Sequence, residues 1–465
     1  MLNKTVKRIL NADVYDAAVE TPLDRATALS TRLKNEVFIK REDLQEVFSF
    51  KIRGAYNKMS SLSAKQRSEG VLCASAGNHA QGLAQAAKLM GVRATIVMPV
   101  TTPEIKVASV RARGAKVVLF GDTFNDALSH ALALEKQRNL HFIHPFDDPE
   151  IIAGQGTVAM EIVHQHSAKI DAVFVPVGGG GLIAGIAAYI KTVRPETQII
   201  GVEYEESASL AAAMAAGRRV KLKQVGIFAD GIAVAQVGKH TWPLMKQYVD
   251  GVITVSSDEI CAAVKDIFDD TRVIAEPAGA VSVAGMKKYV ADKQCQGQTL
   301  ITISTGANAN FDRLRYVTER AEVGEQREAI LAVTIPERQG AFKKFVKVLG
   351  KRLITEFNYR RDEADSARIF LGIKIANREE REQIVAQLEA ANYAVLDLTD
   401  NELAKTHIRH MVGGKASGTQ DETLTRFEFP ERPGALADFL TLLGARWNIT
   451  LFHYRNHGAA YGRVL

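Results

Sequence analysis

Short runs of apolar, β-branched residues alternate with longer helical stretches from about residue 36 to residue 305. Most of these runs lack a regular alternation of polar and apolar positions, which is typical of parallel strands covered by helices on both faces. The pattern therefore predicts an open parallel α/β sheet, divided into two lobes, with ligands at the carboxyl ends of its strands. The expected strands are Val37–Lys40, Val71–Ala74, Ala94–Met98, Lys116–Phe120, Ala172–Val177, Ile199–Glu203, Gly251–Val255 and Leu300–Ser304.

Two of the intervening helices have readable ends. One is expected over Asn78–Met90, before Gly91, and another over Pro103–Arg113, before Gly114. Proline near a helix start and glycine just past a helix end are favoured for steric reasons.

The pattern changes around Thr318–Glu328, where the composition becomes charged. Beyond it, the segment Ile335–Gly350 recurs as Phe429–Gly444, and ITEFNYR at Ile354–Arg360 recurs as ITLFHYR in nearly the same register. A shared register indicates an internal repeat of a small module that combines strands with a helix. Because the second copy stops soon after Arg455, we expect it to be incomplete. The expected domains are 1–320, with a small lobe at about 50–150, a linker at 321–328, and modules at 329–405 and 420–465.

Composition and charge exclude several classes of protein. Of the 465 residues, 46% are hydrophobic and 24% are charged, and the net charge is only +6. This small excess of positive charge, without long runs of like charge, does not indicate nucleic-acid or membrane binding. No apolar segment approaches the ~20 residues that span a bilayer. The three cysteines form no C-x-x-C motif, which suits a reducing compartment, so we expect a cytoplasmic globular protein.

The first candidate functional segment along the chain is Ser49-Phe50-Lys51-Ile52-Arg53. If Ser49 caps a helix, Lys51 lies in its first turn, where the helix dipole and Arg53 both lower the lysine pKa. A lysine of this kind suits a Schiff base with an aldehyde cofactor. The alternative is one of many surface lysines near a helix start.

Two further segments follow expected strands. In Ser75-Ala76-Gly77-Asn78-His79, free backbone N–H groups and the Asn78 amide could bind an anion, or the segment could be a plain turn. In Ser304-Thr305-Gly306, a hydroxyl could contact a ring nitrogen or bind only backbone. Glu276, beside Pro277, is explained by a helix start.

Four glycines, Gly178–Gly181, follow another expected strand and precede Leu182. Their place favours a loop whose backbone N–H groups surround a phosphate. Gly179-x-Gly181-x-x-Ala184 also satisfies the dinucleotide pattern, with Glu203 about 20 residues later, so the segment alone allows an NAD enzyme. No G-K-[ST] occurs, which excludes a Walker-type loop.

In this order the motifs resemble the pyridoxal-phosphate-dependent threonine/serine dehydratase family, over roughly residues 5–320. The resemblance implies a two-lobed fold type II catalytic domain, similar to the tryptophan synthase β-subunit, followed by α+β ACT-like regulatory modules. With the C-terminal repeat, it implies deamination of L-threonine, and also L-serine, to 2-oxobutanoate or pyruvate and ammonia at the start of isoleucine synthesis.

The resemblance also assigns roles to residues. Lys51 would be the catalytic residue and would hold pyridoxal phosphate, with Phe50 against its ring. The loop Gly178, Gly179, Gly180, Gly181 with Leu182 would hold the phosphate, Asn78 the phenolic oxygen, and Thr305 the pyridine nitrogen. Ser75, Gly77 and His79 would take the substrate carboxylate, although His79 by itself is more simply a structural helix residue.

In the repeated modules, Tyr359 and Tyr454 occupy equivalent positions. The resemblance implies isoleucine or valine as effectors, and these tyrosines would line the effector pockets or be core-edge aromatics. It also implies a homotetramer. The alternatives are a catabolic serine/threonine dehydratase or an amino-acid racemase on the same core, an NAD-dependent dehydrogenase, and a non-catalytic amino-acid sensor.

Overall fold

The chain divides into two compact units, the first built on residues 1–314 and the second beginning at residue 315. The structure is a computed structural model. It describes residues 4–325, 327–336, 344–345, 348–350, 352, 354–361, 366–401, 425, 427–430, 442, 454–455 and 461–464. Among these residues, no helix combines the length and the apolar character that a bilayer crossing requires.

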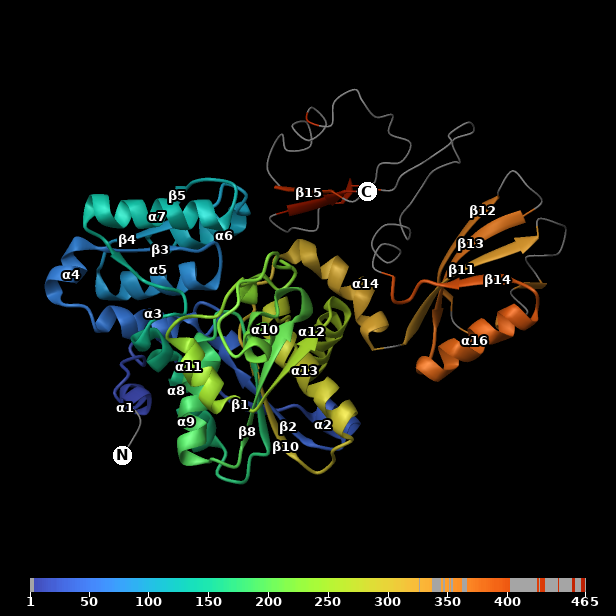
Figure 1. The fold of residues 1–465 in the computed structure, drawn as a ribbon, viewed down its shortest axis with the longest axis horizontal. Helices are drawn as coiled ribbons and strands as arrows, with labels where there is room; N and C mark the ends of the chain where they lie inside the picture. Colours follow the sequence, from blue (N-terminus) through green and yellow to red (C-terminus); the bar gives the residue numbers. More distant parts are fainter. Residues whose placement is uncertain are drawn as a thin grey trace. The chain divides into compact units, whose positions relative to one another are not determined.

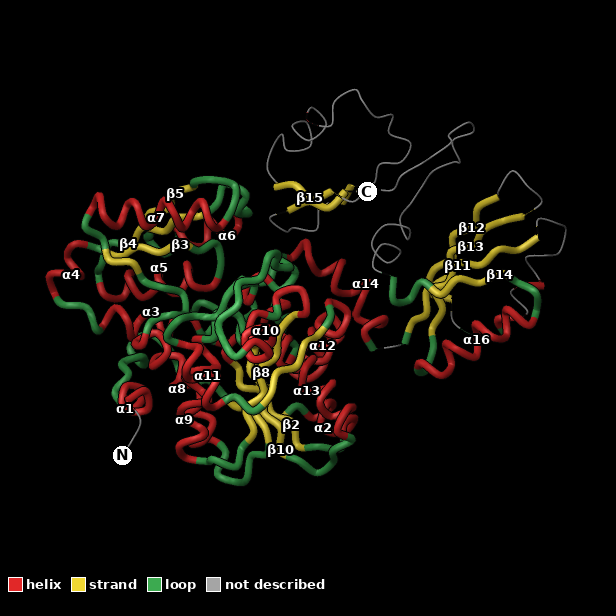
Figure 2. The backbone as a smooth tube through the Cα atoms, viewed as in Figure 1, coloured by secondary structure: helices red, strands yellow, loops and turns green. Residues whose placement is uncertain are grey.

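The larger sheet of the first unit has the strand order β1-β2-β10-β7-β8-β9. Its strands are β1 (Leu23–Arg25), β2 (Glu36–Arg41), β7 (Ala172–Pro176), β8 (Gln198–Tyr204), β9 (Gly251–Val255) and β10 (Thr299–Ser304). Neighbours are parallel except β1, which pairs antiparallel with β2. Every residue of β7 is buried, because helices cover both faces of this sheet (Figure 2). The helices of this lobe are α8 (Pro149–Gln165), α9 (Gly181–Val193), α10 (Ser209–Ala216), α11 (Thr241–Tyr248), α12 (Ser257–Thr271) and α13 (Pro277–Lys293), with α1 (Lys4–Leu10) and α2 (Thr27–Leu33) before them.

The smaller sheet has the order β5-β4-β3-β6 and is parallel throughout. Its strands are β3 (Val71–Ala74), β4 (Ala94–Met98), β5 (Lys116–Leu119) and β6 (His141–Phe142). Its helices are α3 (Lys51–Ser60), α4 (Ala64–Glu69), α5 (Asn78–Met90), α6 (Glu104–Arg111) and α7 (Phe124–Arg138). In Figure 1, α7 lies on one side of β3 and β4 and α5 on the other.

The predicted strands are all present, and their ends differ from the prediction by one residue at most. β1 and β6 were not predicted, because three and two residues are too short to show a period. The helix expected over Pro103–Arg113 is shorter: Pro103 is its N-cap and Arg111 its last residue.

The second unit begins within α14 (Leu314–Gly324). It contains an antiparallel sheet of order β12-β13-β11-β14, with α16 (Arg378–Ala390) after β13. The strands are β11 (Glu328–Pro336), β12 (Ile354–Arg361), β13 (Ser366–Lys374) and β14 (Ala394–Asp397). A further antiparallel sheet, β15-β17-β16, consists of β15 (Phe427–Pro430), β16 (Tyr454–Arg455) and β17 (Tyr461–Val464). Most of the second repeat, including its expected helix, lies outside the described residues.

Candidate active site

Lys51 is the first residue of α3, and its side chain is half-buried. Lys51 Nζ donates a hydrogen bond to the Pro145 carbonyl oxygen at 3.0 Å and lies 5.1 Å from the centre of the Phe50 ring. Burial lowers the pKa of the Lys51 ammonium to about 8, and the nearby Glu276 carboxylate opposes that shift. A lowered pKa gives a neutral, nucleophilic amine near neutral pH.

The expected cause of this shift was wrong. Ser49 does not cap α3: the N-cap is Phe50, which has helical backbone angles and makes no side-chain capping bond, while Ser49 Oγ is buried without a partner. Arg53 is paired with two carboxylates, Glu42 and Glu161, so its charge is compensated. Removal of the Lys51 amine from water, rather than a neighbouring cation, accounts for the shift.

The segment before Lys51 is attached to the end of β10. Ser49 forms an isolated antiparallel bridge with Gly306, and the Phe50 N–H donates to the Thr305 carbonyl at 3.3 Å. The Ala307 N–H donates to the Phe48 carbonyl at 3.0 Å. These bonds hold the predicted motifs around Lys51 and Thr305 side by side.

A chain of polar side chains continues from this point. Asn308 Nδ2 donates to Asn78 Oδ1 at 2.8 Å, and Asn78 Nδ2 donates to Glu276 Oε1 at 2.6 Å. Glu276 is 5% exposed, and burial, reinforced by the Asp230 carboxylate, raises its pKa to about 7. Sequence reasoning missed Glu276 as a site residue, because its place before Pro277 is explained by the start of α13 alone.

The glycine loop lies at the end of β7 and leads into α9, as predicted. Gly180 has φ +93°, and a Cβ there would lie 2.5 Å from Met245 Sδ. A Cβ on Gly179 would lie 2.2 Å from the Phe146 ring. Among the described residues, no hydrogen bond has the backbone N–H of Gly178, Gly179, Gly180 or Gly181 as its donor. Unpaired N–H groups at the N-terminus of a thirteen-residue helix suit an anion such as a phosphate.

Contacts connect the glycine loop to Lys51 on one side and to the hydrogen-bonded side chains of Asn78 and Glu276 on the other. Phe146, which packs on Gly179, follows Pro145, whose carbonyl accepts from Lys51. On the other side, a Cβ on Gly178 would lie 3.0 Å from Ile232, and one on Gly231 would lie 3.4 Å from Glu276 Oε1. The ends of β3, β7 and β10 therefore surround one site.

The segment after β3 contains the residues expected to bind the substrate carboxylate. The Gly77 N–H donates to Ser75 Oγ at 3.3 Å, and a Cβ on Gly77 would meet nothing within 4 Å. His79 is different: its Nε2 is 2.9 Å from the Ile143 carbonyl, and burial lowers its pKa to about 3. A neutral His79 that is bonded to backbone fits the structural interpretation of this residue.

Two hydroxyls lie at the end of β10. Thr305 Oγ1 donates to the Ala278 carbonyl at the long distance of 3.3 Å. Ser304 Oγ is buried and has no partner.

The dinucleotide interpretation of the glycine loop does not fit the structure. It requires the Glu203 carboxylate to reach a ribose, but Glu203 is fully buried and accepts the backbone N–H groups of Leu210 and Ala211 at 2.7 and 2.8 Å. In the described part of the chain, no group of His, Cys, Asp or Glu side chains could hold a metal ion.

Comparisons with known proteins identify both units. Residues 14–306 match the family model described as pyridoxal-phosphate dependent enzyme. Residues 319–408 and 413–465 match the C-terminal regulatory domain of threonine dehydratase. The biosynthetic L-threonine dehydratase IlvA of Burkholderia multivorans is 56% identical over 463 residues, covering 99% of this chain and 91% of the relative. That of Escherichia coli is 52% identical over 461 residues, covering 99% and 90%.

Solved structures share the fold of about two thirds of this chain. The processed threonine deaminase isoform 2 of Solanum lycopersicum has a TM-score of 0.67 and 49% identity, covering 68% of this chain and 92% of that chain. The serine racemase of Dictyostelium discoideum has a TM-score of 0.61 and 31% identity, covering 66% and 98%.

Proposed function

Because the chain belongs to the family of pyridoxal-phosphate-dependent enzymes, and to the branch with the regulatory domain of threonine dehydratase, we propose that it deaminates L-threonine at Lys51. The expected family, fold class and cofactor are confirmed by these matches. The reaction converts threonine to 2-oxobutanoate and ammonia, the first step of isoleucine synthesis, and L-serine would give pyruvate in the same way. The observation that carries the assignment is the half-buried, low-pKa Lys51 amine, which Pro145 and Phe146 connect to the unpaired N–H groups of the glycine loop.

The residues present fit pyridoxal phosphate. The N–H groups of Gly178–Gly181, with Leu182 in the first turn of α9, would hold its phosphate. Phe50 lies beside the Lys51 amine and would pack against the ring. Asn78, held by Asn308 and Glu276, would donate to the phenolic oxygen. Thr305 would face the pyridine nitrogen, since the hydrogen bond of its hydroxyl to the Ala278 carbonyl is long, at 3.3 Å.

Pyridoxal phosphate supplies an aldehyde that links to amines and a conjugated ring that accepts the electrons of a bond broken at the α-carbon. Lys51 Nζ, in its neutral form, would bind the cofactor covalently, and the substrate amine would later take its place. The freed Lys51 Nζ would then be the base that accepts the α-proton of the substrate. The substrate carboxylate would bind in the open space at Gly77, near Ser75 and at the N-terminus of α5, where His79 supports the loop.

Glu276 controls the charge of this site. It accepts from Asn78 and has a pKa near 7, so at neutral pH it is poised between its two protonation states. Its ionised form favours the Lys51 ammonium, and its neutral form favours the free amine.

The second unit would bind the end product and regulate the first. Tyr359 lies in β12 and Tyr454 in β16, and each of these is an edge strand in the order of the described strands. Their side chains lie outside the described residues. Their equivalent positions support effector pockets for isoleucine or valine. We include in the proposal a cytoplasmic location and a homotetramer, which the family resemblance supports; light scattering of the purified holoenzyme tests the tetramer.

The function is tested by 2-oxobutanoate release from L-threonine. Lys51→Ala should abolish release together with the absorbance of the lysine-bound cofactor. Lys65→Ala, which changes an exposed lysine of α4, is the matched control and should retain both. Undiminished release by Lys51→Ala would refute the assignment, and D-serine formed from L-serine in place of pyruvate would favour a racemase.

A further inference from the structure

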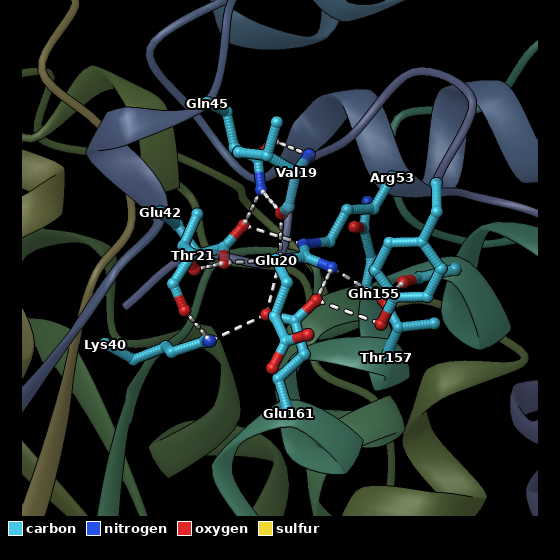
Figure 3. Close-up of polar contacts among 12 residues, drawn as sticks. Val19, Glu20, Thr21, Lys40, Glu42, Gln45, Arg53, Gln155, Thr157 and Glu161 are labelled. Carbon is cyan, nitrogen blue, oxygen red and sulfur yellow. Dashed lines mark hydrogen bonds and ion pairs between the residues drawn. The ribbon is translucent and has the colours of Figure 1, made fainter. Parts of the chain in front are cut away.

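Four charged side chains are packed in the interior beside α3, outside the site described above. Their exposures are 0% for Lys40, 0% for Glu42, 0% for Arg53 and 2% for Glu161. Figure 3 shows that they face one another, and their formal charges cancel. We call Lys40, Glu42, Arg53 and Glu161 the buried ion cluster.

Arg53 lies at the centre of this cluster and uses all its donor atoms. Its guanidinium binds the Glu42 carboxylate at 2.8 Å through both Nε and Nη2. Nη1 and Nη2 bind the two oxygens of Glu161 at 2.5 and 2.9 Å. Nη1 also donates to Thr157 Oγ1 at 3.1 Å. A planar guanidinium held by two carboxylates has its orientation fixed, not merely its charge compensated.

The cluster joins three separate segments of the chain. Lys40 comes from β2, Glu42 from the turn after it, Arg53 from α3 and Glu161 from α8. Lys40 Nζ contacts Glu161 Oε2 at 2.6 Å and the Thr21 carbonyl at 2.5 Å. α3 is thereby tied to β2 of the large sheet, to α8 and to the N-terminal segment.

Stability alone is a weak reason for such a cluster. Desolvation of buried charges offsets much of their attraction, and apolar side chains of similar volume often stabilise a core as well. An ion cluster does, however, fix the relative orientation of the elements that carry its side chains, and here one of those elements is α3.

Lys51 and Arg53 extend from different faces of α3. Lys51 and Arg53 are two residues apart, and at about 100° per residue their side chains leave the helix about 200° apart. Arg53 therefore extends from the face nearly opposite to Lys51. A group fixed there resists rotation of the first turn about the helix axis, and that rotation would carry the Lys51 amine sideways.

Close backbone contacts hold the same turn. A Cβ on Gly82 of α5 would lie 3.0 Å from the Lys51 carbonyl carbon. A Cβ on Gly154 of α8 would lie 2.7 Å from the Arg53 carbonyl oxygen. These contacts fix the distance of α3 from its neighbours, whereas the forked bonds of Arg53 fix its rotation.

We propose that the buried ion cluster is a rotational lock for α3, with Arg53 as the positioning residue that aims Lys51 at the cofactor and substrate. The inference rests on the proposed role of Lys51. A rotation of 10° moves an atom at a radius of about 6 Å by about 1 Å. Misplacement of a reacting group by 1 Å costs on the order of 100-fold in rate.

The test compares two variants of the holoenzyme. Arg53→Lys keeps the charge but cannot bind two carboxylates in a plane, so kcat for threonine should fall about 10- to 100-fold while KM changes far less. Circular dichroism in the cofactor band, per bound cofactor, should fall as well, because it reports the fixed orientation of the chromophore. Arg41→Lys is the matched control: it makes the same substitution in another buried ion pair, with Asp43 and Asp24, which lies outside the buried ion cluster and off α3. It should lower the thermal midpoint and leave the dichroism and kcat unchanged.

The outcomes separate the possibilities. If Arg53→Lys keeps its dichroism and kcat, or if Arg41→Lys loses both to the same extent, the lock is refuted. Should Arg53→Lys not fold, Thr157→Val removes one bond to Arg53 without changing any charge and should reduce both quantities in the same direction. An unchanged Thr157→Val would then overturn the proposal. Absence of a Lys51-dependent cofactor band in the wild-type holoenzyme would instead refute the proposed function.

Discussion

The protonation state of Lys51 can be tested without turnover. Burial lowers its pKa from 10.5 to about 8. At pH 7 about 9% of the amine is then neutral, against about 0.03% for an ordinary lysine, a difference of about 300-fold. Between pH 7 and pH 9 the neutral fraction rises about 10-fold for a pKa of 8, but about 100-fold for an ordinary lysine. The rate at which the cofactor-free protein binds pyridoxal phosphate covalently should follow this fraction.

The assay is stopped-flow absorbance of the lysine-bound cofactor after the cofactor-free protein is mixed with pyridoxal phosphate, from pH 6 to pH 10. The rate should level off near pH 9. Glu276→Gln removes the carboxylate that favours the ammonium, so the midpoint should move below pH 8. Glu203→Gln is the control, since Glu203 is also buried with a pKa near 7 but contacts backbone N–H groups of α10. A rate that still rises steeply above pH 9, or a midpoint raised by Glu276→Gln, would contradict the reasoning.

Three further changes have defined outcomes. Gly180→Ala places a Cβ 2.5 Å from Met245 Sδ at a residue with φ +93°, a backbone conformation that alone costs a side chain about 1–2 kcal/mol. This variant should therefore bind the cofactor at least 10-fold more weakly in equilibrium dialysis. Unchanged affinity would count against the role of this loop in binding phosphate. Burial raises the pKa of Glu203 in the folded protein to about 7. The contribution of Glu203 to the free energy of unfolding is therefore fully present below about pH 4.5 and is lost as the pH rises through 7. In Glu203→Gln, the thermal midpoint should decline less steeply between pH 5 and pH 8. L-Isoleucine should raise the threonine concentration at half-maximal rate, and Tyr359→Ala or Tyr454→Ala should weaken this effect; no response to isoleucine in the wild type would remove the proposed role of the second unit.

The parallel strands could be predicted because burial on both faces leaves a simple signature. β7 is apolar throughout and buried throughout, and the same holds for β3. β1 could not be predicted, because a three-residue strand is defined by its partner β2 and not by its own pattern.

The parts of the site that could be predicted from the sequence are the glycine-containing segments at the ends of strands. The loop Gly178–Gly181 and the segment Ser75–His79 each follow the carboxyl end of a buried parallel strand, where ligands are expected to bind. Glu276 was not predictable as a site residue, and neither were Glu42 and Glu161 as partners of Arg53, because these contacts form between segments that are distant in the sequence. The Ser49 cap was wrong for the same reason: the bridge to Gly306 fixes that segment in place of a local cap.

The central claim is that Lys51 carries the cofactor with which threonine is deaminated. Borohydride reduction of the holoenzyme, followed by proteolysis and mass spectrometry, locates the lysine that bears pyridoxal phosphate. The account predicts the cofactor's added mass on the peptide that contains Phe50 and Lys51, and its loss from that peptide in Lys51→Ala. Cofactor attached at any other lysine, or none attached, would contradict it.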